Sequence, residues 1–152
     1  MEEVKEGIAE LIRKYRGDVE KLSKYLSWLE SKGGEKMCSN YNPDEKTNTT
    51  MIVPIYDSTL LGLVKTAQGT AFMNRNYVYT YSRKKLVTAK DEHDFIDSTK
   101  IMDLPALGDI LSSYVMKGMV KGSVWCEGVN NGVLYHVIKQ MKELIEFWTV
   151  PM

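Results

Sequence analysis

Apolar residues recur three or four positions apart through most of this 152-residue chain, which is the spacing of one face of an α-helix. The clearest case begins at Asp103, which is placed to cap a helix that has Pro105 in its first turn. The same spacing predicts helices at about 58–69, 88–96, 103–117, 122–130 and 133–148. The sequence therefore predicts a mainly α protein, a compact helical domain of about six helices.

The N-terminal residues 1–34 predict a helical hairpin. Gly17 is expected to end its first helix, and Asp18 is placed to cap the second. Residues 35–50 are rich in Asn, Thr, Asp and Lys, a composition typical of a polar loop. Residues 51–152 then form the main body of one domain that spans the whole chain, 1–152.

The sequence leaves room for a small β element at about residues 51–56 and 70–81. The first segment, MIVPIY, is short and apolar, but Pro54 confines a strand there to an edge or an end of a sheet. The second segment overlaps MNRNYVYTYSRKK at 73–85, which fits a strand or a helix equally well.

MNRNYVYTYSRKK sets three alternating tyrosines between basic residues. In a strand all three rings share one face, whereas in a helix Tyr77 and Tyr81 share a face and Tyr79 departs from it. Rings beside Arg and Lys are typical of a stacking platform for bases or nucleotides, but tyrosine is also a common half-buried core residue. The candidate ligand-binding residues here are Arg75, Tyr77, Tyr79, Tyr81 and Arg83.

The segment KGMVKGSVW combines lysines and glycines just before a predicted helix. The free amides of a helix N-terminus, with ammonium groups nearby, can bind an anion, and an indole can supply an apolar wall. The alternative is a plain turn between two helices. The candidate ligand-binding residues here are Lys117, Lys121, Ser123 and Trp125.

The charge balance bears on partners and location. Twenty basic and twenty acidic residues cancel, which counts against nucleic acid as a partner. No stretch approaches the roughly 18 to 20 apolar residues of a membrane span, and MEEVKEGIAE lacks the features of a secretory signal. We therefore expect a cytoplasmic protein with no membrane partner and with Cys38 and Cys126 reduced, and the oligomeric state stays open.

The sequence shows no established catalytic or cofactor motif. On a helix His93 and Asp97 would share a face and could reach one metal ion, but a site needs three or four ligands. The acidic run at 91–94 is therefore interpreted as a solvated helix start, and His136 as a residue at the edge of the core. Cys126 near a helix N-terminus is either a reactive thiol or a buried one. We expect no catalytic residue, no metal and no cofactor.

Residues 102–145, MDLPALGDILSSYVMKGMVKGSVWCEGVNNGVLYHVIKQMKELI, resemble the C-terminal half of a family of small uncharacterised bacterial proteins. In that family a helix leads through a basic turn into a short helix, which stops where Asn131-Gly132 stands here, and a long helix follows. Residues 56–81 are similar to its first half. Over 56–147 the resemblance implies a helical fold and a bacterial or mobile-element setting. The family is a domain of unknown function, so the resemblance implies no site residue.

The sequence thus favours a non-enzymatic binding protein that captures a small anionic, nucleotide-like ligand or a protein partner. A phage or mobile-element protein that counters host defences fits this profile. One alternative is single-stranded nucleic-acid binding through the basic residues Arg75, Arg83, Lys84 and Lys85. The other is an enzyme that uses Cys126 or His93.

Overall fold

The computed structural model describes residues 2–32, 39–41, 53–55, 58–121 and 123–149, and these residues are mainly helical. In chain order the elements are α1 (Glu2–Ser23), α2 (Leu26–Lys32), β1 (Ser39–Tyr41), β2 (Val53–Ile55), α3 (Ser58–Gln68), α4 (Tyr77–Arg83), α5 (Ala89–Ser98), the 3-10 turn η1 (Ile101–Asp103), α6 (Leu104–Val120), α7 (Ser123–Asn130) and α8 (Val133–Thr149). The described ranges thus hold eight α-helices, where the sequence predicted about six.

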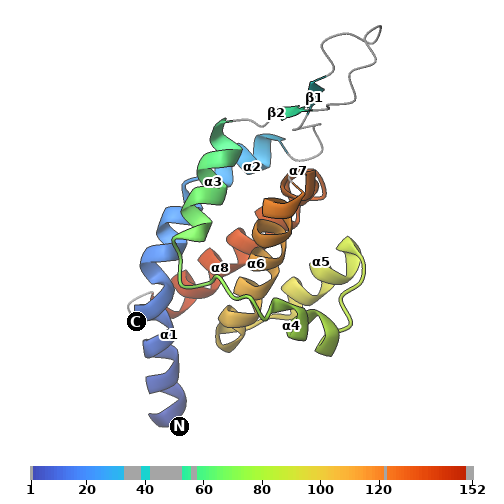
Figure 1. Cartoon of the computed structure of the whole chain (residues 1–152). Helices are drawn as coiled ribbons and strands as arrows, with labels where there is room; N and C mark the ends of the chain where they lie inside the picture. The colour runs from blue at the N-terminus through green and yellow to red at the C-terminus, as the bar shows by residue number, and fades with distance from the viewer. Residues whose placement is uncertain (1, 33–38, 42–52, 56–57, 122, 150–152) are drawn as a thin grey trace, which may run out of the picture.

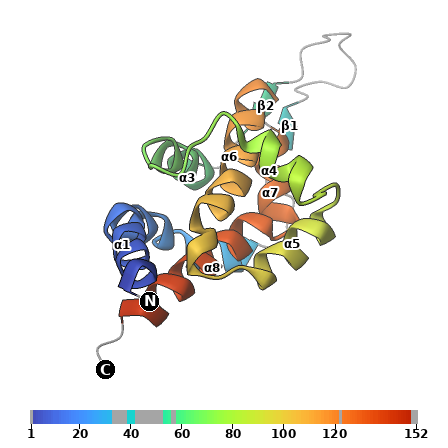
Figure 2. The same cartoon turned by 90° about the horizontal axis from the view of Figure 1, so that it is seen from below.

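Helix α6 lies at the centre of the molecule (Figure 1). Its Leu104, Leu107, Ile110 and Leu111 are fully buried. Helices α1 and α3 lie on one side of α6, and α4 and α5 lie on the other (Figure 2). Helix α8 closes the core by packing against α1, α5, α6 and α7. No helix of the described part is both long and apolar enough to cross a bilayer.

The N-terminal segment is not the hairpin that the sequence predicted. Helix α1 continues straight through Gly17, because a single glycine costs only about 1 kcal/mol in a helix and the buried Val19 and Leu22 favour continuation. Asp18 does not cap a helix but accepts the backbone N–H of Ala71 (2.9 Å). Helix α1 packs against α3 and α8, whereas α2 packs against α7 and α8.

The β element is a two-stranded antiparallel pair of β1 and β2. Ser39 lies opposite Ile55 and Tyr41 lies opposite Val53. The strand expected within 51–56 is therefore confirmed, while β1 falls inside the expected polar loop at 35–50. The rest of that loop lies outside the described residues.

The small β element for which the sequence left room at 70–81 does not form, and residues 77–83 are helix α4, the helical alternative for this segment. Buried side chains of α6 hold this segment in place. The Asp109 carboxylate accepts the Asn74 amide (2.8 Å) and the Thr80 hydroxyl (2.5 Å), and the Ser112 hydroxyl accepts the Asn74 backbone N–H (2.9 Å). Contacts with a helix distant in sequence thus override the β preference of alternating Tyr, Val and Thr.

The other predicted helices are confirmed, with local differences at their ends. Thr88 caps α5 in a capping box with Asp91. Asp103 stands at the start of α6, but its side chain accepts the Lys100 backbone N–H (2.9 Å) and does not cap α6. Gly118 in α6 allows Trp125 of α7 to pack closely, since a Cβ at Gly118 would lie 2.0 Å from the indole.

Candidate functional site

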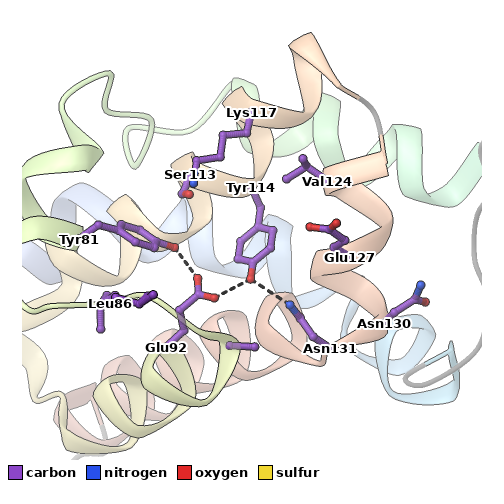
Figure 3. A pocket seen from close by; sticks show the side chains of 12 residues that line it. Tyr81, Leu86, Glu92, Ser113, Tyr114, Lys117, Val124, Glu127, Asn130 and Asn131 are labelled. Atoms are coloured by element: carbon purple, nitrogen blue, oxygen red, sulfur yellow. Dashed lines mark hydrogen bonds between the residues drawn. The ribbon is translucent and has the colours of Figure 1, made fainter.

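A cavity of about 630 Å³ opens between the α4–α5 connection, α6 and α7 (Figure 3). Its volume is typical of sites for small organic molecules. Its wall is apolar at the connection and polar toward α6 and α7. The lining residues are Tyr81, Leu86, Val87, Ala89, Glu92, Ser113, Tyr114, Lys117, Val124, Glu127, Asn130 and Asn131.

The Glu92 carboxylate is held in the cavity wall by two phenols from different helices. The Tyr81 hydroxyl donates to Oε2 (2.5 Å), and the Tyr114 hydroxyl donates to Oε1 (2.7 Å). Asn131 donates its Nδ2 amide to the Tyr114 oxygen (3.0 Å). Figure 3 shows the carboxylate between the two hydroxyls, with Asn131 on the other side of the Tyr114 hydroxyl. Helices α4, α5 and α6 and the turn after α7 thus meet at one acidic group.

Both phenols keep their protons over a wide pH range. Burial raises the pKa of Tyr81 well above the usual tyrosine value, and the nearby charge of Glu92 and the hydrogen bond to it raise it further. Burial is also the main reason that the pKa of Tyr114 is raised, followed by its hydrogen bond to Glu92 and the charge of that residue. The two hydroxyls therefore act as fixed hydrogen-bond donors and not as bases or nucleophiles.

The ionisable side chains of the lining make the cavity acidic. Glu92 is only 7% exposed and forms no ion pair within the described ranges. Glu127 on α7 adds a second carboxylate, which is exposed. Lys117 is the one basic residue of the lining, and its Nζ lies 5.3 Å from the centre of the Tyr81 ring. Two carboxylates against one ammonium favour a ligand that brings positive charge or N–H donors.

Part of the sequence-predicted tyrosine site comes together. Tyr81 and Lys117 line the cavity, and Lys117 also lies over the Tyr77 ring (5.8 Å). Tyr79 lies apart from them and is 64% exposed, as the helical alternative predicted. Arg75 and Arg83 are exposed and do not line the cavity.

Of the predicted anion site before α7, Lys117 lines the cavity, whereas Lys121 and Trp125 do not. Lys121 is exposed and does not line the cavity. Trp125 packs against Gly118 and donates its indole N–H to the Val115 carbonyl (3.0 Å), which is a structural role. The Ser123 side chain lies outside the described residues.

Sequence reasoning missed Glu92, Ser113 and Tyr114, which form the buried wall of the cavity. The interpretation of the acidic run at 91–94 as solvated is wrong for Glu92, which is buried together with Ile96 on α5. The available signal was helical spacing: Glu92 stands four residues before Ile96 and therefore shares its face.

The sequence also raised metal binding by His93 and Asp97 and a reactive thiol at Cys126. Asp97 pairs with His136 (2.7 Å) and not with His93, and the described residues contain no group of three potential metal ligands. Cys126 is buried, which is one of the two alternatives that the sequence left open, but it is disulfide-bonded, so the expectation that it is reduced is wrong. The second cysteine of the sequence, Cys38, lies outside the described residues.

Comparison with protein-family models, characterised proteins and solved structures yields no match. The resemblance over residues 56–147 therefore stays an expectation drawn from the sequence, and the functional proposal below depends on the geometry of the site.

Proposed function

We propose that the protein is a non-enzymatic binding protein whose cavity takes a small organic molecule with a cationic or N–H-donating head group, bound at Glu92. The observation that carries this proposal is the state of Glu92: a buried carboxylate in a cavity wall, oriented by two phenols, with no ion pair in the described part of the chain.

Burying a carboxylate without a counter-charge is costly, so buried carboxylates are usually paired or bind a ligand. The two phenols reduce that cost and fix the direction of the carboxylate, and each oxygen keeps a lone pair for another donor. A cationic head group would supply the missing charge, and the apolar connection at Leu86 and Val87 would contact the body of the ligand. This reverses the charge of the ligand expected from sequence, because Glu92 was not expected to be buried.

Probes of matched size test the sign of the ligand charge. Benzylamine and benzamidine are the cationic probes, benzyl alcohol is neutral, and benzoate and phenyl phosphate are anionic. We expect the cationic probes to raise the melting temperature, by the equivalent of about 2.7 kcal/mol at one hundred times their dissociation constant. Stabilisation by the anionic probes alone, or by no probe, would contradict the proposal.

Two variants on the same helix separate the site from general charge effects. Glu92→Gln removes the buried carboxylate, and we expect at least a tenfold loss of affinity for the cationic probes in calorimetric titration. Asp94→Asn removes one charge from the exposed face of α5 and should leave the affinity unchanged. Glu127→Gln should weaken binding less than Glu92→Gln, since Glu127 is exposed and its charge is screened.

Single-stranded nucleic-acid binding is the second candidate, favoured by the exposed ring of Tyr79 on a helix flanked by exposed basic residues. These basic residues are Arg75, Arg83, Lys84 and Lys85. This candidate predicts binding to an oligothymidylate that weakens steeply with salt and that Tyr79→Ala reduces. Tyr79 does not line the cavity, so that variant should leave binding of the cationic probes unchanged. A role against host defences in a phage or mobile element stays a proposal about setting.

A further inference from the structure

The two histidines of the chain lie against each other at the junction of α5 and α8. The rings of His93 and His136 have centroids 4.9 Å apart, and their planes are inclined to each other by 23°. Their Nδ1 atoms are 2.6 Å apart, which is hydrogen-bond distance. His93 also packs near Gly132, which needs its positive φ of 77° to turn the chain from α7 into α8.

The other nitrogen of each ring has a partner that fixes where its proton is. His93 Nε2 lies 2.8 Å from the backbone carbonyl of Asn131, and His136 Nε2 lies 2.7 Å from the Asp97 carboxylate. A carbonyl and a carboxylate only accept hydrogen bonds, so both Nε2 atoms must carry hydrogen. If both rings were neutral, each Nδ1 would carry a lone pair, and the two lone pairs would face and repel each other. If both rings were charged, each Nδ1 would carry a hydrogen, and the two N–H groups would repel each other. Only one proton between them gives a hydrogen bond.

The spacing between the Nδ1 atoms fits a proton better than a metal ion. Histidine nitrogens bind zinc at about 2.0 to 2.1 Å, so two tetrahedral ligands lie about 3.3 Å apart. The observed 2.6 Å is shorter than that distance.

We propose that His93 and His136 form a single-proton site, an imidazole–imidazolium pair that locks α5 to α8 and sets the pH range in which the cavity is formed. The proton bound between the rings, with Asp97 as its counter-charge, holds His93 against the Asn131 carbonyl. The connection to the cavity depends on the proposed function, whereas the proton site itself does not.

Asn131 connects the proton site to the cavity wall. Its backbone carbonyl accepts from His93, and its side chain donates to Tyr114, which in turn donates to Glu92. Glu92 and His93 are also neighbours on α5, so separation of α5 from α8 would displace the carboxylate together with the ring. Opening of the pair should therefore disorder the cation-binding wall.

The ionisable surroundings of the pair are simple. Among the described residues Asp97 is the charged group in contact with a ring. The elements packed around the pair contribute further ionisable groups. They are Lys90, Asp91, Glu92 and Asp94 on α5, Asp109, Tyr114 and Lys117 on α6, Glu127 on α7, Tyr135, Lys139, Lys142, Glu143 and Glu146 on α8, Asp103 in η1 and Lys100 just before it. Asp94 pairs with Lys90, Lys139 with Glu143, and Lys142 with Glu146, so these six groups have partners of their own.

The proton count gives the sign of the pH dependence. A second proton would set two N–H groups against each other in the native pair, so acid should favour separation of the rings. Loss of the shared proton would set two lone pairs against each other, so base should also favour separation. The contribution of the pair to stability should therefore pass through a maximum with pH, and the unfolding constant should change by up to tenfold per pH unit on each side.

Histidine-selective 15N NMR and denaturation from pH 5 to 8.5 test the proton site without any ligand. We expect both Nε2 atoms protonated at pH 6.5, one downfield proton shared by the two Nδ1 atoms, and a stability maximum that His93→Gln and His136→Gln each flatten. Two independent titrations and an unchanged profile in both variants would overturn the proposal. A rise in melting temperature on addition of zinc that requires both histidines would also overturn the proposal, because the two rings would then bind a metal ion and not a shared proton.

Benzylamine affinity, measured across the same pH range, tests the connection to the cavity. We expect affinity to fall at least tenfold from pH 7 to pH 5 in the natural protein and to become less dependent on pH in His136→Gln. An intact proton site with pH-independent affinity would overturn the connection alone. If no cationic probe binds at pH 7, the proposed function fails while the NMR result still decides the proton site.

Discussion

Removing one hydroxyl from the Glu92 cluster should cost far more stability than removing one from the surface. Tyr114→Phe deletes the donor to Glu92 Oε1 (2.7 Å) and leaves the Asn131 amide without its acceptor. A buried hydrogen bond to a charged group contributes about 1.5 to 3 kcal/mol. We therefore expect Tyr114→Phe to lower the free energy of unfolding by about 2 kcal/mol, or roughly 4 to 8 °C in melting temperature for a chain of this size.

Urea denaturation followed by far-ultraviolet circular dichroism measures this loss. Tyr79→Phe is the matched control, because Tyr79 is exposed and forms no hydrogen bond among the described side chains, and its loss should stay within about 0.5 kcal/mol. Tyr81→Phe should behave like Tyr114→Phe, and the double variant should lose more than the sum, because Glu92 then keeps neither donor. Equal, small losses in Tyr114→Phe and Tyr79→Phe would refute the role assigned to the cluster.

Two further predictions concern pH and packing. The pKa values of Tyr81 and Tyr114 are raised in the folded chain. Above about pH 10 the folded chain therefore binds more protons than the unfolded chain, and the free energy of unfolding should fall as pH rises further. Tyrosinate absorbance should show these two rings ionising only on unfolding; ionisation in the folded protein at pH 10 would contradict this. Gly118→Ala should lower the free energy of unfolding by about 1 to 3 kcal/mol, since its Cβ would lie 2.0 Å from Trp125. Gly17 has open space around it, so Gly17→Ala should raise the free energy of unfolding by about 0.5 to 1 kcal/mol. Equal effects of the two alanines on the urea midpoint would contradict the packing at Trp125.

The helices of the second half could be predicted because their local signals agree with their packing. α6 has Pro105 in its first turn and an apolar run that is buried almost throughout. The turn at Gly132 requires a positive φ, which glycine adopts readily. In each case the residues that define the element are also the residues that form its contacts.

The failures occur where a distant residue decides the local structure. Residues 77–83 have a β-like pattern, but Asp109, about thirty positions later, holds Thr80 in a helix. Gly17 resembles a helix stop, but the packing of Val19 and Leu22 carries α1 past it. Neither Asp109 nor the partners of α1 can be assigned from spacing alone.

The sequence by itself predicted a mainly helical chain, which the structure confirms, and it named Tyr81 and Lys117 as candidates in two separate stretches. Both residues line the cavity. Periodicity and local chemistry contain that information, because they act over one or two helical turns. Only the tertiary structure decided that Glu92 is buried between two phenols and that His93 faces His136. Those contacts join residues that are 11 to 43 positions apart in the chain, which is beyond the reach of local periodicity.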